Sequence, residues 1–395
     1  MARIDSGLQY EFRLRTRLVH GPGVVDLLGR HTAELGAARA VLVTDAGVAA
    51  AGHAERAARS LVKAGIEVLR YDDTPASPAA GDVAACREAV GQFDPEVLVA
   101  VGGGSAIDLA KALNFVLCGG GRIEDYRGSN TAKGDLLPLI AVPTTAGTGS
   151  EVQAFALIQD DTTHAKLACG DRRAVPELAL LDPELSVTMP RPVTATSGMD
   201  AVVHAVETAV TVTRTRASET FSHRAFADLV DALPRVLEEP RDLYERGRML
   251  LASAWAGVAI ENSMLGAAHA MANPLTARFG TVHGQAVATT LPVVVRFNAE
   301  DPEVRAEYAE LARCARIAPA GVSEHAAVDA LVARLVDLNA LAGFPSRLGQ
   351  LGVGVRELDE LAGLAAQEWT AQFNPRAVDR GAFRALYDRL YAGEF

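Results

Sequence analysis

The first 190 residues alternate short apolar segments with helical ones, and this alternation constrains the fold more than any other feature. Four apolar, β-branched segments predict strands, at 38–45, 66–73, 95–101 and 136–143. Segments with helical spacing lie between them, at 54–65, 81–93 and 106–117. Apolar strands separated by helices of about ten to fifteen residues are typical of a parallel sheet covered on both faces. We therefore expect a parallel, Rossmann-like α/β domain.

A different pattern begins near residue 190. Before it, FALIQDDTTHAKLACG (155–170) predicts a hairpin around a polar turn. After it, strand signals fade and helical spacing dominates, at 196–210, 218–237, 246–265, 328–343, 355–369 and 382–393. We predict a dinucleotide-binding α/β domain over 1–190 and an all-helical, metal-binding domain over 191–395.

Length and composition exclude several classes of protein. A chain of 395 residues is too long for one core, which agrees with two domains. The net charge of -11 and the absence of a Lys/Arg run argue against nucleic acid and anionic membrane partners. The N-terminal MARIDSGLQYEFRLRT has no signal-peptide core, and the four cysteines are scattered. We expect a reduced, cytoplasmic protein without membrane helices.

Three glycines follow the strand of VLVAVGGGSAIDLAKAL. Gly102, Gly103 and Gly104 end the strand, and Ser105 opens a helix. Glycines allow close backbone approach to a pyrophosphate, and the N–H groups of a helix start attract its charge. The pattern differs from GxGxxG, and glycines also make ordinary strand-to-helix turns. Phosphate binding and a plain turn both remain open from these residues alone.

A second loop, PTTAGTGSE (143–151), also follows an apolar strand. Its hydroxyl side chains are potential cofactor donors: Thr144, Thr145, Thr148 and Ser150. Loops at the ends of neighbouring parallel strands are where a dinucleotide binds in an open α/β sheet. Asp45, at the end of VLVTD, can accept a hydrogen bond from the adenosine ribose and would repel a 2′-phosphate, which favours NAD over NADP. The alternative for Asp45 is a plain turn residue.

Four residues in the second half form a candidate metal site. Asp200 and His204 lie four apart, so on a helix they share one face. His269 lies on an apolar helical stretch, and His283 follows a turn. A carboxylate with neutral imidazoles suits Fe(II) or Zn(II), and we expect Fe(II) first. The alternative is a set of unrelated histidines.

These motifs together resemble a known family. VTDAG, GGGSAIDLAK, PTTAGTGSE, LDPEL, SGMDAVVHAVE, HAMANPLTARFGTVHG and NPR (374–376) occur in the order and at the spacing of the iron-containing (group III) alcohol dehydrogenases. The resemblance covers nearly the whole chain. It implies an N-terminal nucleotide-binding domain, a helical C-terminal domain in the dehydroquinate synthase-like architecture, and a homodimer or larger homo-oligomer.

The resemblance also assigns roles to residues. The family's metal ligands fall on Asp200, His204, His269 and His283, and its pyrophosphate loop on Gly102 to Ser105, with Asp108 on the following helix. It implies that Thr144, Thr145 and Thr148 lie on the nicotinamide and ribose side. Lys166 matches a lysine that reaches the cofactor ribose, and Leu185 a residue that lines that side.

One position departs from the family pattern. Many relatives carry a second histidine where this chain has Asn273. An amide can orient water or substrate but has no titratable proton near neutral pH, so we expect the proton to leave through a cofactor ribose hydroxyl and water. Arg278 is a candidate partner for an anionic substrate, and the alternative is a surface arginine.

The expected function is hydride transfer between nicotinamide C4 and a metal-bound alcohol or carbonyl of a small substrate. An NAD(H)-linked alcohol dehydrogenase or aldehyde reductase fits best, with Fe(II) or Zn(II) as the ion. Three alternatives share the architecture: a Zn-dependent polyol dehydrogenase, a maleylacetate-type reductase and a dehydroquinate-synthase-like lyase. A non-catalytic nucleotide-binding protein is the remaining alternative.

Overall fold

A computed structural model describes residues 10–163 and 165–395. Most of the N-terminal segment examined for a signal peptide therefore lies outside the described residues. The chain divides into two compact units. One comprises Leu14–Pro190 with Arg241–Ala254, and the other comprises Arg191–Pro240 with Trp255–Phe395 and the described residues before Leu14. The longer segment of the sheet-containing unit thus ends at Pro190.

A six-stranded sheet forms the first unit, and all of its neighbouring strands are parallel. Its order is β1-β9-β6-β4-β2-β3. The strands are β1 (Arg17–His20), β2 (Arg39–Val43), β3 (Glu67–Tyr71), β4 (Val97–Gly102), β6 (Leu139–Pro143) and β9 (Leu178–Leu181). The predicted parallel α/β fold is confirmed. Strand β1 was not predicted.

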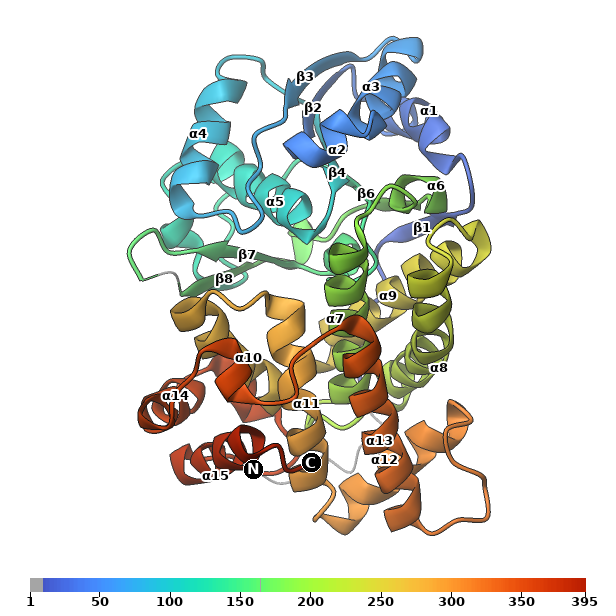
Figure 1. Ribbon diagram of the computed structural model, residues 1–395. Helices are drawn as coiled ribbons and strands as arrows, with labels where there is room; N and C mark the ends of the chain where they lie inside the picture. Colours follow the sequence, from blue (N-terminus) through green and yellow to red (C-terminus); the bar gives the residue numbers. More distant parts are fainter. Residues whose placement is uncertain (1–9, 164) are drawn as a thin grey trace. The chain divides into compact units, whose positions relative to one another are not determined.

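Every residue of β4, β6 and β9 is buried, as expected for strands with both faces covered. The helices of this unit are α1 (Leu28–Glu34), α2 (Ala46–Ala50), α3 (His53–Lys63), α4 (Ala80–Val90), α5 (Gly104–Gly119) and α6 (Pro183–Ser186) (Figure 1). Leu28 of α1 and Leu61 of α3 pack against Leu42 and Val99 of the sheet in one hydrophobic core.

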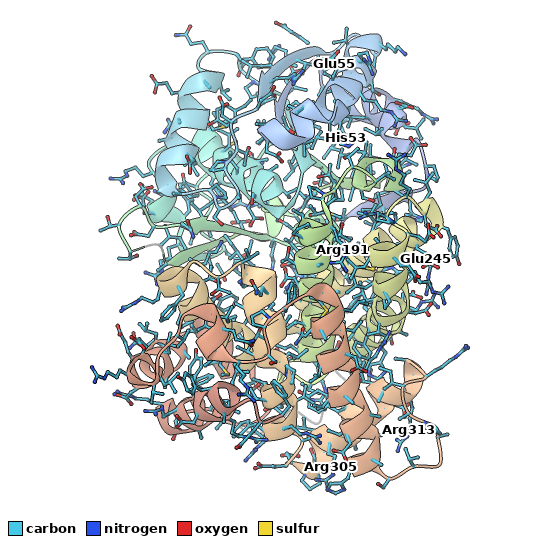
Figure 2. All side chains as sticks on the ribbon, in the orientation of Figure 1. His53, Glu55, Arg191, Glu245, Arg305 and Arg313 are labelled. Atoms are coloured by element: carbon cyan, nitrogen blue, oxygen red, sulfur yellow. The ribbon has the colours of Figure 1, made fainter. Side chains whose placement is uncertain are left out.

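His53, which is labelled in Figure 2, has a structural role, because its Nε2 lies 2.7 Å from Thr188 Oγ1.

The predicted hairpin is present. Strands β7 (Phe155–Gln159) and β8 (Lys166–Gly170) are antiparallel, and β5 (Gly128–Ser129) extends them to a small second sheet. Gly170 is required here, because a Cβ at this position would lie 2.4 Å from the Phe155 ring.

The second unit is helical. Its elements are α7 (Arg191–Thr208), α8 (Arg216–Glu238), α10 (Ala267–Phe279), α11 (His283–Asn298), α12 (Pro302–Cys314), α13 (Glu324–Ala342), α14 (Leu358–Ala365) and α15 (Arg380–Ala392). Helix α7 is buried from Gly198 to its end, and it packs against α8 and α11. Helix α9 (Leu243–Ser263) is shared: its residues up to Ala254 group with the sheet-containing unit, which the sequence did not indicate.

A search of the described residues finds no helix that is both long enough and apolar enough to cross a membrane.

Candidate active site

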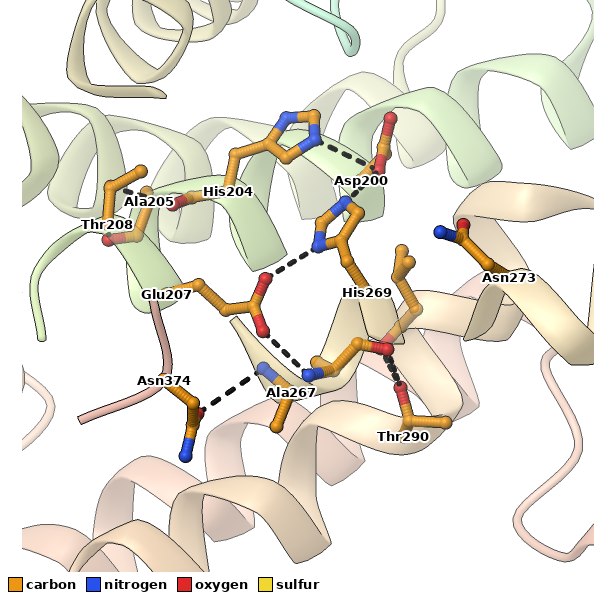
Figure 3. A network of polar contacts seen from close by, with 12 residues as sticks. Asp200, His204, Ala205, Glu207, Thr208, Ala267, His269, Asn273, Thr290 and Asn374 are labelled. Carbon is orange, nitrogen blue, oxygen red and sulfur yellow. Dashed lines mark hydrogen bonds and ion pairs between the residues drawn. The ribbon is translucent and has the colours of Figure 1, made fainter. Parts of the chain in front are cut away.

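Three helices bring the predicted metal ligands together, and Figure 3 shows Asp200, His204 and His269 among them. Helix α7 carries Asp200 and His204 one turn apart, α10 carries His269, and His283 is the first residue of α11. One ligand atom from each of Asp200, His269 and His283 lies within 4.8 Å of the others. The Nε2 atoms of His269 and His283 are each 3.8 Å from Asp200 Oδ1. Residues up to 83 apart in sequence therefore meet at one carboxylate oxygen.

His204 lies beside this group. Its Nε2 is 3.4 Å from Asp200 Oδ1, and its ring stacks on His269 with centroids 5.0 Å apart. Three of the four side chains are almost fully buried, whereas the side chain of His283 is 35% exposed. His283 is therefore the most exposed of the four side chains.

The charges in the cluster shift the pKa of two members in opposite directions. Burial raises the pKa of Asp200, but the neighbouring His204, His269 and His283 outweigh it and hold this pKa well below its usual range. Burial lowers the pKa of His269, but Glu207 and Asp200 raise it to about 9. Both shifts follow from opposite charges held close together in a buried cluster.

The donor set fits a divalent metal ion. Asp200 Oδ1 and His269 Nε2 are buried and make no hydrogen bond to any residue that the structure describes. Their separation of 3.8 Å is beyond hydrogen-bond reach but spans two ligands of one ion. Buried polar atoms without partners are costly, so their convergence indicates a ligand between them. Mixed carboxylate and imidazole ligands suit Fe(II) or Zn(II).

A close contact between helices sets the position of His283. Gly284, in the first turn of α11, lies against the backbone of α7, where a Cβ would be 2.1 Å from the carbonyl oxygen of Thr196. A residue without a side chain is therefore required at this crossing. The contact holds the start of α11, and with it His283, against the helix that carries Asp200.

A buried carboxylate contacts one ligand of the cluster, and an amide contacts the start of the helix that carries this ligand. The Glu207 carboxylate lies 2.6 Å from His269 Nδ1 and accepts a hydrogen bond from the backbone N–H of Ala268, at 2.7 Å (Figure 3). Asn374 Oδ1 accepts from the N–H of Ala267, at 3.3 Å. Sequence reasoning did not assign Glu207, although an acid three residues after His204 on an apolar helix is a usable signal. In the sequence analysis, Asn374 was named only as part of the NPR motif and was given no role.

Asn273 lies one turn beyond His269 on α10. Its amide donates to Glu368 Oε2 at 2.7 Å, and burial raises the pKa of Glu368. Arg278 does not show the cleft position considered for an anionic substrate. Its guanidinium pairs with Glu360, and both side chains are half-exposed. The structure thus favours a surface ion pair, and Arg278 is not part of our proposal.

The two predicted cofactor loops pack against each other in the sheet-containing unit. A Cβ at Gly103 would lie 3.2 Å from Thr145 Oγ1, and one at Gly104 would lie 2.6 Å from Thr148 Cγ2. Thr144 continues the sheet contact, because its N–H donates to the carbonyl oxygen of Gly102. The glycines are therefore needed for loop packing as well as for any approach by a phosphate.

Asp45 lies at the carboxyl end of β2, next to the glycine loop. One carboxylate oxygen accepts from the N–H of Val48 and caps α2, while the other would lie 3.4 Å from a Cβ on Gly102. The turn role thus uses one oxygen, the other lies beside the glycine loop, and the ribose contact stays a prediction. Helix α5 begins at Gly104, one residue before the predicted start at Ser105, and the Ser105 hydroxyl donates to the carbonyl oxygen of Ala76.

Two predicted cofactor residues also make internal contacts. The Ser150 hydroxyl donates to Asp108 and accepts from Lys111 Nζ, at 2.8 Å for the lysine. Asp108 also accepts from the N–H of Leu157. These bonds hold the second loop, and contact of either residue with a cofactor stays a prediction.

Two further carried-over positions lie in the same unit. Lys166 is the first residue of β8, and its charge acts on Asp108. Leu185 is 1% exposed and belongs to the hydrophobic core. Their contacts with a cofactor stay predictions.

Comparisons with known proteins agree with this fold. Residues 15–183 match the family model "Iron-containing alcohol dehydrogenase", and residues 194–391 match "Fe-containing alcohol dehydrogenase family, C-terminal". The NAD-dependent methanol dehydrogenase of Bacillus methanolicus is 33% identical over 91% of this chain and 94% of that protein. The 1,3-propanediol dehydrogenase of Citrobacter freundii is 32% identical over 94% of this chain and 96% of that protein. The alcohol dehydrogenase structure from Oenococcus oeni is 30% identical with a TM-score of 0.92, covering 97% of this chain and 100% of that one.

Together these observations define an oxidoreductase that acts on CH–OH groups. More narrowly, the chain belongs to the iron-containing alcohol dehydrogenase family.

Proposed function

We propose that this protein is a metal-dependent, NAD(H)-linked dehydrogenase that interconverts a small alcohol and its aldehyde. The observation that carries the proposal is the convergence of His269 and His283 on Asp200, with His204 beside them. The relatives named for methanol and for 1,3-propanediol support a small alcohol as substrate. We also propose that the protein forms a homo-oligomer, on the basis of the family resemblance. The four free cysteines support a cytoplasmic location.

The chain's own residues divide the work between binding and orientation. Asp200, His204, His269 and His283 would hold the ion, which supplies Lewis acidity toward an alcohol or carbonyl oxygen when bound. The more exposed His283 side leaves the cluster accessible to a small molecule. Asn273 can hold a substrate or water oxygen through its amide, but it cannot carry a proton near neutral pH.

The loops of the sheet-containing unit would bind the nucleotide, which supplies or accepts the hydride. The backbone of Gly102 to Ser105 fits a pyrophosphate at the start of α5. The negative charge of Asp45 beside Gly102 favours NAD, since it would repel a 2′-phosphate. Thr145 and Thr148 border the same loop and are the proposed contacts on the nicotinamide side.

The proposal is tested by anaerobic reconstitution with Fe(II) and, separately, with Zn(II). NADH absorbance is followed with small aldehydes, half of them neutral and half carrying a carboxylate or phosphonate. We expect metal-dependent NADH loss that disappears in Asp200→Ala and persists in Asp388→Ala, a half-exposed aspartate paired with Arg384 on α15. If the protein binds NADH but does not oxidise it with either metal, the proposal is contradicted, and the lyase or the non-catalytic alternative is favoured.

A further inference from the structure

Glu207 is a buried acid that no ligand role explains. It lies three residues after His204 on α7, and only 3% of its surface is exposed. Burying a carboxylate is expensive unless hydrogen-bond donors satisfy it. Its two oxygens have such partners: Oε1 accepts from the N–H of Ala268, and Oε2 faces His269 Nδ1. Both contacts are short, at 2.7 and 2.6 Å, as expected for bonds to a charged acceptor.

The contact with His269 decides which ring nitrogen carries the proton. Glu207 as a carboxylate only accepts, so His269 Nδ1 has to donate. In a neutral imidazole the proton on Nδ1 leaves a lone pair on Nε2, the atom that lies 3.8 Å from Asp200 Oδ1. We propose that Glu207 is a positioning residue that fixes the Nδ1–H form of His269 and thereby keeps Nε2 available to the metal. This inference rests on the metal centre proposed above.

The same carboxylate also fixes the backbone that carries His269. Its bond to Ala268, together with that of Asn374 to Ala267, satisfies N–H groups in the first turn of α10 that have no partner within the helix. A Cβ on Gly266 would lie 3.2 Å from Glu207 Oε1, so the glycine before the helix makes room for this contact. Glu207 therefore holds both the ring and the main chain of one ligand.

Substitution by glutamine separates these roles with little change of shape. The two partners of Glu207 are donors, whereas a glutamine amide offers one acceptor and one donor group. If the amide oxygen keeps the Ala268 bond, its NH₂ faces His269 Nδ1 and favours a proton on Nε2. That form has its lone pair on Nδ1 and leaves none on Nε2 for a metal. Asn374→Ala is the matched control, because it removes a bond to the same helix end without touching the imidazole.

The experiment measures metal affinity of the full-length protein, independently of turnover. Zn(II) affinity is determined by competition with a chromophoric chelator, and the Co(II) visible spectrum reports the ligand geometry. We expect Glu207→Gln to weaken Zn(II) binding about 10- to 100-fold, the usual loss for a residue that orients a metal-binding histidine. We expect its Co(II) spectrum to change, and Asn374→Ala to retain wild-type affinity and spectrum.

A measurement on the wild type protects the test from a variant that fails to fold. With ¹⁵N-labelled histidine in the Zn(II)-loaded protein, the His269 signal, assigned by its absence in His269→Ala, should show the proton on Nδ1 and the metal on Nε2. A proton on Nε2 with the metal on Nδ1 would overturn the inference. Unchanged Zn(II) affinity in Glu207→Gln, or an equal loss of affinity in Asn374→Ala, would do the same. Failure of the wild type to bind metal would instead refute the proposed function itself.

Discussion

Replacing Gly284 with alanine tests whether helix contact sets the metal site. The added Cβ would lie 2.1 Å from the Thr196 carbonyl oxygen, and both atoms belong to helices, so neither can rotate away. A carbon–oxygen contact needs roughly 3.3 Å, so α11 has to move from α7 by about 1 Å at this point. His283 is the preceding residue and moves with it.

The magnitude follows from the difference between that movement and the tolerance of a metal site. Overpacking of this kind costs about 1–3 kcal/mol of stability. Metal–ligand distances tolerate deviations of only about 0.2 Å, so a displacement of His283 by about 1 Å removes most of its contribution to binding. We therefore expect Zn(II) affinity to fall at least about tenfold, equivalent to about 1.4 kcal/mol.

The assay combines metal competition with urea unfolding. Gly363→Ala is the control, because Gly363 lies within α14 and a Cβ there would meet only Arg380 Nε, at 3.8 Å. Removing a glycine from a helix stabilises by up to about 1 kcal/mol, so the control should keep its metal affinity and gain stability. If Gly284→Ala binds Zn(II) like the wild type and unfolds at the same urea concentration, the reasoning about α7 and α11 is wrong.

Three further predictions concern the cofactor, the proton and pH. Asp45→Asn should keep the cap of α2 but lose the repulsion of a 2′-phosphate, so kcat/KM for NADPH relative to NADH should rise by about tenfold or more; an unchanged ratio would contradict the ribose role. Asn273→His should leave metal content intact and add a titrating group next to Glu368, so the pH profile of kcat/KM should change; an identical profile would exclude position 273 from the proton route. Burial raises the pKa of Glu151 to about 7, so the stability linked to its neutral form is complete below its unfolded value near 4.5 and is lost as pH rises through 7. Between pH 5 and pH 8, the melting temperature of the wild type should therefore fall relative to that of Glu151→Gln, by the equivalent of up to about 3 kcal/mol of unfolding free energy. Parallel curves of melting temperature against pH for the two proteins would contradict this prediction.

The fold was predictable wherever the apolar period was long. The runs that became β2, β4 and β6 are continuous because both faces of the sheet are covered, and α7 and α13 show sustained helical spacing. Strand β1 has only two half-buried residues between two exposed ones, so its four residues carry no period. Helix α12 was missed although Asp301 and Pro302 provide a start signal.

The site was predictable where one helix fixes two residues. The spacing of Asp200 and His204 is a property of α7 alone. For His269 and His283 the residue types allowed either one metal site or unrelated histidines, and the family resemblance favoured the metal site. Its place on the apolar helix three residues after His204 marks Glu207 as a candidate, but its partners lie 61 and 62 residues away, so the sequence does not indicate what it contacts.

The internal contacts of Ser150 were not predicted for a related reason. A hydroxyl in a loop looks available in the sequence, but tertiary contacts with Asp108 and Lys111 occupy it.

Deuteride transfer tests the central claim most directly. The metal-loaded protein is incubated with NADH carrying deuterium at nicotinamide C4, prepared separately as each stereoisomer, and a small aldehyde, and the alcohol is analysed by mass spectrometry. We predict that one isomer delivers one deuterium to the former carbonyl carbon, and that the product is absent with Asp200→Ala, although this variant still binds NADH. Alcohol without deuterium from both isomers, or equal product from Asp200→Ala, would contradict metal-dependent hydride transfer by this protein.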